Sequence, residues 1–167
     1  MLTQVTEISP ETVDRLFAVY AESMADLAEN FPNEKEMRSS YEGFLREFIA
    51  GPGQLILVET EDGGWRSALR AVERRPGVWF IEAVETDPRF RGRGFGRRLL
   101  MHTIDLLVSR GAKRIESTIH PDNTASNRLH AACGFRPTED PPVNCWGETE
   151  TGCVLWRYER TGDGKGE

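Results

Sequence analysis

Residues 91–98 read RGRGFGRR, with three glycines and four arginines in eight positions. Glycine tolerates a positive φ, so this segment can bring successive backbone N–H groups close to one anion. A helix that begins within the segment would add its own unpaired N–H groups and the positive end of its dipole. The stretch therefore predicts a loop that binds phosphate.

The segments on either side predict a strand before this loop and a helix after it. Residues 78–84, VWFIEAV, are rich in aromatic and β-branched side chains and follow a turn signal at 75–77. After the loop, apolar residues recur at helical spacing from Leu99 to Val108, and Gly111 stands where a helix usually ends. The loop is therefore expected to connect a strand to a helix.

Other ligands for such a loop fit the sequence poorly. A dinucleotide-binding fingerprint requires a third glycine where Arg97 stands, and a P-loop requires Gly-Lys followed by Ser or Thr, which is absent. A disordered Arg-Gly segment that binds nucleic acid would lack the apolar flanks, and the net charge of −6 opposes such binding. We therefore expect no nucleic-acid partner.

The pattern Arg-x-x-Gly-x-Gly between a strand and a helix resembles the acyl-CoA pyrophosphate loop of the GCN5-related N-acetyltransferases, the GNAT family. A second block, residues 123–135 with the sequence NTASNRLHAACGF, is similar to a later helix of that family, which commonly begins with Asn and ends in Gly-Phe. The two blocks stand in the family's order. The resemblance implies an acyl-CoA-dependent N-acyltransferase that moves acetyl from acetyl-CoA to a primary amine of a small molecule or peptide, by direct transfer in a ternary complex.

The resemblance also implies which residues bind the cofactor. The pyrophosphate of coenzyme A is expected in the loop, and the backbone at Val84 and Thr86 is expected to hydrogen-bond the pantetheine arm and to polarise the thioester carbonyl. Asn123, Asn127 and His130 share one helix face, which favours a common polar role toward the cofactor. The predicted cofactor-binding residues are Val84, Thr86, Arg91, Gly92, Arg93, Gly94, Phe95, Gly96, Asn123 and Asn127.

Two residues are predicted to be catalytic, because amine acylation needs a base for the ammonium proton and an acid for the departing thiolate. Glu82 stands two residues before Val84, so a regular strand places both on one face, and several family members use a Glu at the matching position as base. Glu85 would point to the other face and ranks second. His130 stands where family members usually have a tyrosine, and an imidazole with an unperturbed pKa of about 6.5 can give up a proton near neutral pH.

Simpler explanations remain open for both residues. A strand glutamate is often only solvated or ion-paired, and the histidine could lie on the helix surface without a role. The missing tyrosine also leaves a second hypothesis for the whole chain, a non-catalytic acyl-CoA-binding sensor of the same fold. Between Glu7 and Glu47 ten acidic residues face four basic ones, which would favour a cationic acceptor but is equally explained by solvated helix faces.

Length and composition are ordinary for a soluble globular protein. The 167 residues suit one domain, 38% of them are hydrophobic, and no apolar run approaches the ~20 residues of a membrane span. The first residues do not read as a signal peptide. The three cysteines lack metal-binding spacing, so no metal is expected and a cytoplasmic location is the default.

The expected fold class is α/β (α+β): one GNAT-like domain over residues 1–160, followed by a disordered tail at 161–167. Its mixed, mostly antiparallel sheet would contain a splayed parallel strand pair around the loop, with helices on both faces. Exposed strand edges make a homodimer a further expectation. The expected elements are strands at 2–8, 54–60, 65–73, 78–84, 113–119 and 152–158, and helices that begin at Pro10, after Asn33, after the loop and at Asn123.

Overall fold

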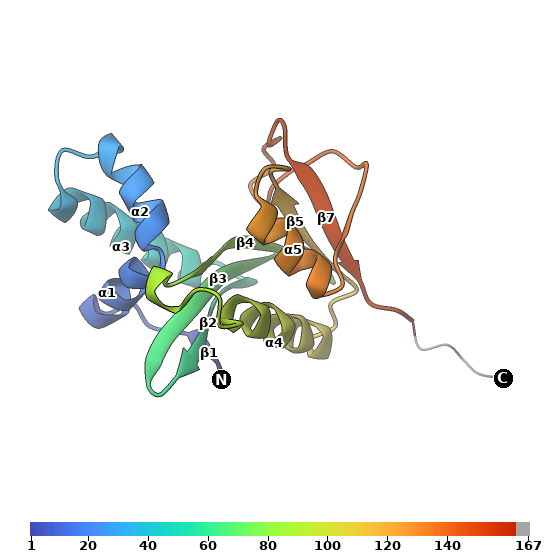
Figure 1. Ribbon diagram of the computed structural model, residues 1–167, viewed down its shortest axis with the longest axis horizontal. Helices are drawn as coiled ribbons and strands as arrows, with labels where there is room; N and C mark the ends of the chain where they lie inside the picture. Colours follow the sequence, from blue (N-terminus) through green and yellow to red (C-terminus); the bar gives the residue numbers. More distant parts are fainter. Residues whose placement is uncertain (163–167) are drawn as a thin grey trace. The chain divides into compact units, whose positions relative to one another are not determined.

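A computed structural model of the protein describes residues 1–162, and in this part of the chain five α-helices accompany a seven-stranded sheet (Figure 1). The strand order in the sheet is β1-β2-β3-β4-β5-β7-β6. The strands are β1 Leu2–Val5, β2 Gln54–Glu61, β3 Gly64–Arg75, β4 Val78–Thr86, β5 Arg114–Ile119, β6 Arg136–Pro137 and β7 Val154–Glu159. The helices are α1 Pro10–Val19, α2 Ala21–Leu27, α3 Glu34–Ala50, α4 Phe95–Ser109 and α5 Thr124–Ala132, with short 3₁₀ turns at Ala28–Asn30 and Pro88–Phe90.

The sheet contains the predicted parallel pair. Strands β4 and β5 run parallel, whereas β1 with β2, β5 with β7 and β6 with β7 are antiparallel. The β4–β5 ladder extends only from Val78 opposite Arg114 to Phe80 opposite Glu116, although both strands continue beyond it. The expected mixed sheet with a parallel pair is therefore confirmed.

The chain divides into two compact units, each with its own packing. The first, called the N-terminal unit here, comprises Met1–Ala71 and Ala83–Leu99. The second, the C-terminal unit, comprises Val72–Glu82 and the chain from Leu100 onward. Strands β3 and β4 and helix α4 contribute residues to both.

Side-chain caps start two helices of the N-terminal unit, α1 and α3. The Ser9 side chain accepts a hydrogen bond from the Thr12 N–H at 3.2 Å, and Asn33 caps α3 through the Glu36 N–H at 2.9 Å. Pro10 is the first residue of α1, as predicted. Tyr20 ends α1 and directly precedes α2, so the chain after Pro10 forms two helices where the sequence predicted one. The largest fully buried apolar side chains of this unit are Leu16, Leu45, Ile56, Leu57, Leu69 and Leu99.

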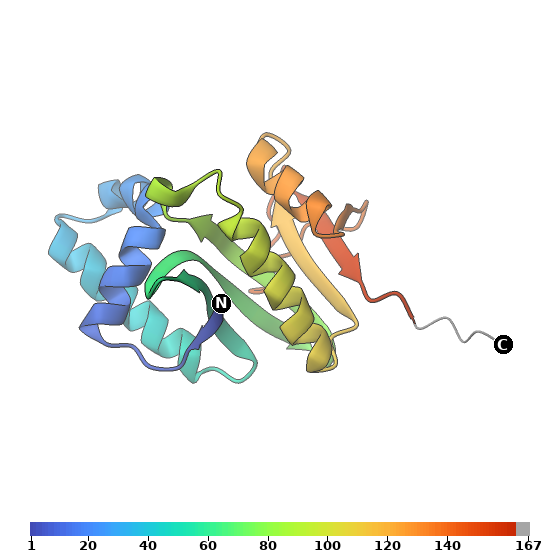
Figure 2. The same ribbon diagram turned by 60° about the horizontal axis from the view of Figure 1, so that its bottom comes forward.

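In the C-terminal unit, α5 lies beside β5 and β7 (Figure 2). The buried apolar residues of the C-terminal unit include Phe80, Ile81 and Leu107. One charged side chain is also buried: Glu116 is 4% exposed and accepts hydrogen bonds from the Arg157 guanidinium at 2.9 and 3.1 Å. The arginine compensates the cost of burying that carboxylate.

Several boundaries differ from the expectation. Strand β1 ends at Val5 instead of residue 8, β4 continues to Thr86, and the two-residue strand β6 was not expected. Of the tail predicted at 161–167, residues 163–167 lie outside the described part of the chain, and the domain boundary at residue 160 stays a prediction. In residues 1–162 no helix is both long and apolar enough to cross a membrane.

Candidate functional site

The predicted phosphate loop has a backbone that requires glycine at two positions. Gly92 has a φ of 75° and Gly94 a φ of 81°. A Cβ atom added to either residue would meet no other atom within 4 Å. Crowding by neighbouring atoms therefore does not explain the two glycines. They are needed because an L-residue with a side chain is strained at this positive φ.

Helix α4 begins within the glycine- and arginine-rich stretch, at Phe95, inside the N-terminal unit. The Arg98 N–H donates to the Gly94 carbonyl at 3.0 Å, so the N–H groups of Phe95, Gly96 and Arg97 precede the first bond of this helix. Phe95 is 3% exposed, and its carbonyl accepts a hydrogen bond from the Ser67 hydroxyl at 3.2 Å. This anchor on β3 fixes the helix end, whose N–H groups and dipole suit a negatively charged ligand.

Arginines surround this helix end. Arg91, Arg93 and Arg97 are exposed, and Arg91 forms an ion pair with Glu22 of α2. Arg98 pairs with Glu61 at 3.2 Å, so part of its charge serves a contact within the protein. The remaining positive charge favours an anion at the loop.

A buried aspartate holds the turn before the loop. Asp87 is 1% exposed and accepts hydrogen bonds from the Arg89 backbone N–H at 2.9 Å and from its guanidinium at 2.7 and 3.1 Å. Burial by itself would raise the pKa of Asp87, but the hydrogen bonds and charge of Arg89 bring that pKa below its usual value. The turn is thus stabilised by an ionised carboxylate.

Strand β4 is irregular where the cofactor's thioester was expected. Ala83 has a φ of 53°, and its carbonyl accepts a hydrogen bond from the Tyr20 hydroxyl at 2.7 Å. A residue in this conformation interrupts the alternation of side chains along a strand. The expectation that Glu82 and Val84 share one face assumed a regular strand, and that assumption is wrong.

The irregularity of β4 affects the comparison of Glu82 and Glu85 as candidate bases. Glu82 is half-buried and belongs to the C-terminal unit. Glu85 lies in the N-terminal unit, where its carboxylate accepts hydrogen bonds from the Ser23 N–H at 3.2 Å and the Ser23 hydroxyl at 2.6 Å. Burial raises the pKa of Glu85 even though the Ser23 hydrogen bonds oppose that rise. Sequence reasoning ranked Glu85 second because a regular strand would turn it to the other face. It did not identify Ser23 as a partner, since Ser23 is 62 residues away in the chain.

A cavity of about 410 Å³ lies next to this irregular strand, within the N-terminal unit. Helices α2 and α3, strands β3 and β4 and the residue between α1 and α2 all contribute to its wall. It is lined by Tyr20, Ser23, Met24, Asp26, Leu27, Tyr41, Phe44, Arg70 and Ala83. Because Ala83 directly precedes Val84, this cavity, called the β4 cavity below, is the candidate site for the acceptor.

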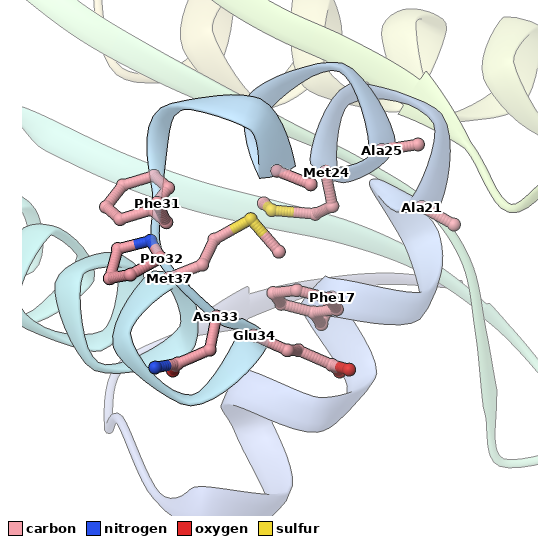
Figure 3. A pocket seen from close by; sticks show the side chains of 10 residues that line it. Phe17, Ala21, Met24, Ala25, Phe31, Pro32, Asn33, Glu34 and Met37 are labelled. Atoms are coloured by element: carbon pink, nitrogen blue, oxygen red, sulfur yellow. The ribbon is translucent and has the colours of Figure 1, made fainter.

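A second cavity of about 470 Å³ lies between α1, α2 and the start of α3 (Figure 3). Its lining is mainly apolar, and Met24 and Met37 point toward each other above Phe17. Met24 also lines the β4 cavity. The complete lining is Phe17, Ala21, Met24, Ala25, Ala28, Phe31, Pro32, Asn33, Glu34 and Met37.

His130 is buried in the C-terminal unit, where it is 1% exposed. The helix-surface explanation for this residue is therefore wrong. Its Nδ1 atom lies 2.8 Å from the Ser126 carbonyl oxygen, and because that oxygen only accepts hydrogen bonds, we assign the ring proton to Nδ1. Burial lowers the pKa of His130, and its Nε2 atom is buried without a partner among residues 1–162. The ring is thus a neutral imidazole with an accepting Nε2.

The two asparagines of the same block stabilise the local backbone. The Asn123 side chain caps α5 by accepting a hydrogen bond from the Ser126 N–H at 3.1 Å. The Asn127 side chain donates to the Pro121 carbonyl at 3.0 Å. Each asparagine has a structural role in starting the helix that carries His130.

The predicted site residues fall into both units. The loop residues, Val84 and Thr86 are in the N-terminal unit, whereas Glu82, Asn123, Asn127 and His130 are in the C-terminal unit. Sequence reasoning missed Ser23, Tyr20 and Arg70, which carry no motif. No group of three or more His, Cys, Asp or Glu side chains suited to a metal ion occurs within residues 1–162.

Comparisons with known proteins show which family this chain is similar to. Residues 20–135 match the family described as "Acetyltransferase (GNAT) family". An L-2,4-diaminobutyric acid acetyltransferase from Nocardia farcinica is 31% identical over 70% of this chain and 63% of its own length. An aminoglycoside N(6′)-acetyltransferase type 1 from Salmonella typhimurium is 34% identical over 37% of this chain and 43% of its own length. The chain thus spans less than two thirds of these relatives.

Solved structures share the fold at lower identity. The PaiA N-acetyltransferase from Thermoplasma acidophilum, in complex with coenzyme A, superimposes with a TM-score of 0.70 at 14% identity. The superposition covers 96% of this chain and 99% of that one. At this identity the likeness concerns the fold.

Proposed function

Because the chain belongs to the acetyltransferase (GNAT) family, we propose that it is an N-acyltransferase that moves acetyl from acetyl-CoA to a primary amine. The observation that carries this proposal is the loop at residues 91–96, which combines left-handed Gly92 and Gly94 with the first N–H groups of α4. A pyrophosphate needs several N–H donors directed at one point and positive charge nearby. Arg91 and Arg93 supply the charge.

The named acceptors of the relatives support an amine acceptor. Those names specify diaminobutyric acid and an aminoglycoside, each of which presents an amino group. The thioester of acetyl-CoA is already activated, so the transfer needs no metal. The homodimer and the cytoplasmic location expected from the sequence stay predictions.

The reaction joins the amine nitrogen to the acetyl carbon and breaks the bond from that carbon to sulfur. The ammonium group must first lose a proton, and the departing thiolate must gain one. Backbone N–H groups at Val84 and Thr86 would bind the pantetheine arm and the carbonyl oxygen, on which negative charge develops. Direct transfer in a ternary complex fits these roles, since no covalent enzyme intermediate is required.

Two glutamates compete for the role of base. Glu82 stays our first assignment because of its match to the family position. Glu85 has the advantages of a raised pKa and a carboxylate held by Ser23, which lines the β4 cavity. A base with a pKa shifted toward neutrality accepts a proton more effectively near pH 7. Comparing Glu82→Gln with Glu85→Gln decides between them.

His130 is proposed to act at the thiol. Its neutral ring and accepting Nε2 suit a hydrogen bond from the S–H group of the product coenzyme A. To protonate the thiolate directly, the ring would first have to take up a proton. His130→Phe should therefore slow the transfer and leave the binding of coenzyme A largely unchanged.

The decisive experiment follows free thiol release from acetyl-CoA with a broad panel of primary amines. Turnover that falls at least tenfold in one of the two glutamate variants supports the proposal and identifies the base. Calorimetry with coenzyme A provides the second measurement. Tight cofactor binding without turnover on any amine would instead favour a non-catalytic acyl-CoA sensor.

A further inference from the structure

The second cavity, between α1, α2 and the start of α3, presents an apolar wall and is called the methionine cavity below (Figure 3). Four of its lining residues have large apolar side chains: Phe17, Met24, Phe31 and Met37. Its volume of about 470 Å³ lies within the usual range of small-molecule sites. Because apolar surface gains free energy when a ligand displaces water from it, this space suits an apolar group.

Helix α2 connects the methionine cavity to the β4 cavity. Met24 lines both cavities, and Ser23, its neighbour in the chain, lines the β4 cavity. Ser23 donates hydrogen bonds to the Glu85 carboxylate at 2.6 and 3.2 Å, so a candidate base contacts the residue directly before Met24. Consecutive Cα atoms are only about 3.8 Å apart. An amine beside Glu85 would therefore need a chain of a few carbon atoms to reach the methionine cavity.

The walls of the methionine cavity differ in rigidity. Phe17 is held by two contacts, because the central guanidinium carbon of Arg38 lies 4.5 Å from its ring centre and the Tyr41 ring centre lies 6.2 Å away. Met24 and Met37 point toward each other above Phe17 (Figure 3). Their unbranched side chains have three rotatable bonds and adapt to the shape of a ligand. A rotamer change at Met24 would open the wall that the two cavities share, while Phe17 stays in place.

The polar lining residues restrict the chemistry of the ligand. Among the ten described residues that line the methionine cavity, Glu34 is the one with a charged side chain. A chain that ends in a carboxylate or phosphate would meet like charge there, and it would also lose hydration in an apolar space. The Asn33 side-chain oxygen already accepts a hydrogen bond from the Glu36 N–H at 2.9 Å. The lining therefore favours an uncharged apolar chain.

We propose that the acceptor is a primary amine on an apolar chain, whose amine reacts in the β4 cavity while the chain lies in the methionine cavity. This inference rests on the proposed N-acyltransferase function and narrows its substrate class. Met24 and Phe31 are then specificity-determining residues that take no part in proton transfer.

A series of straight-chain amines from propylamine to octylamine tests this inference. Each methylene that enters the methionine cavity should raise kcat/KM by about fourfold, the effect of burying one CH₂ group. We therefore expect octylamine to exceed propylamine at least about tenfold, since this requires only two buried methylenes. Equal kcat/KM at all chain lengths would overturn the inference but leave the acyltransferase function intact.

Two alanines provide a blocking variant and its matched control. Ala28 lines the methionine cavity, whereas Ala18 is exposed on α1 and belongs to the described lining of neither cavity. Ala28→Phe should occupy part of the cavity and lower the octylamine-to-propylamine ratio of kcat/KM at least about fivefold, whereas Ala18→Phe should keep the wild-type ratio. Phe31→Ala removes one apolar wall and should lower the ratio as well. If both cavity variants keep the wild-type ratio, the chain lies elsewhere and the inference is wrong.

A binding measurement separates failure of this inference from failure of the proposed function. If no amine turns over, the proposed function fails, and calorimetry with the same amines in the presence of coenzyme A decides the inference. Affinity that rises with chain length in the wild type, but much less in Ala28→Phe, supports it. Affinity that is independent of chain length, or that rises equally in both proteins, overturns it.

Discussion

Replacement of Gly94 by alanine isolates the backbone requirement of the loop before α4. The φ of Gly94 is 81°, a conformation that costs an L-residue roughly 1–2 kcal/mol. An added Cβ would meet no atom within 4 Å, so no steric clash contributes to the loss. We therefore expect Gly94→Ala to lower the free energy of unfolding by about 1–2 kcal/mol through backbone strain alone.

Gly43 provides a matched control on α3. A Cβ atom added there would also meet no other atom within 4 Å, but the φ of Gly43 is not in the left-handed region. Alanine in a helix interior is more favourable than glycine by roughly 0.5–1 kcal/mol. Gly43→Ala should therefore stabilise the protein, and the two variants should differ by about 1.5–3 kcal/mol.

Urea unfolding of the wild type and both variants measures this difference, and calorimetry with coenzyme A measures its effect on binding. Relief of the strain in Gly94→Ala would redirect the N–H groups at the start of α4. We expect its affinity for coenzyme A to fall at least about tenfold, while Gly43→Ala keeps the wild-type affinity. Equal unfolding free energies for the two variants would refute the reasoning, because the expected difference comes from the left-handed φ at Gly94 and the helical backbone at Gly43.

Three further predictions concern the polar contacts. Burial raises the pKa of Glu85 above its usual 4.5, so the folded protein retains a proton there at a pH where the unfolded chain has lost it. Binding this proton stabilises the folded state, and the stabilisation disappears as the pH rises through the folded pKa. Glutamine does not titrate, so the unfolding free energy of Glu85→Gln should rise relative to that of the wild type as the pH increases from about 4 to 7. A difference between the two proteins that stays constant over this range would contradict the prediction. Burial lowers the pKa of His130, so the wild type should lose stability as the pH falls below about 6.5, and His130→Gln should flatten that decline in urea titrations. Tyr20→Phe leaves the Ala83 carbonyl without its hydroxyl donor and should lower the free energy of unfolding by about 1 kcal/mol. Ala83→Gly should relieve the strain of the positive φ and raise the free energy of unfolding by up to about 1 kcal/mol. Thermal unfolding of both variants checks these opposite changes.

The outcomes for individual residues show how far sequence reasoning reached. Gly92 and Gly94 were identified as backbone positions because glycine signals a positive φ directly, and the structure has that conformation at both. Pro10 likewise predicted the start of α1. The ranking of Glu82 above Glu85 assumed a regular strand, but a positive φ falls on Ala83, a residue type that gives no signal for it. The choice between the two glutamates therefore stays a prediction.

The sequence alone thus determined the order of the longer elements, the position of the glycine-rich loop and the family, since each depends on residues that are neighbours in the chain. Tertiary structure decided the rest. The Ser23–Glu85 and Tyr20–Ala83 hydrogen bonds join residues 62 and 63 positions apart, and Arg70 meets the rings of Tyr20 and Phe44 only after β3 packs near the helices. Burial and partner geometry set a pKa and build a cavity, and neither is a property of a short stretch of sequence. The loop therefore identified the donor from sequence, whereas the evidence on the acceptor came from the folded chain.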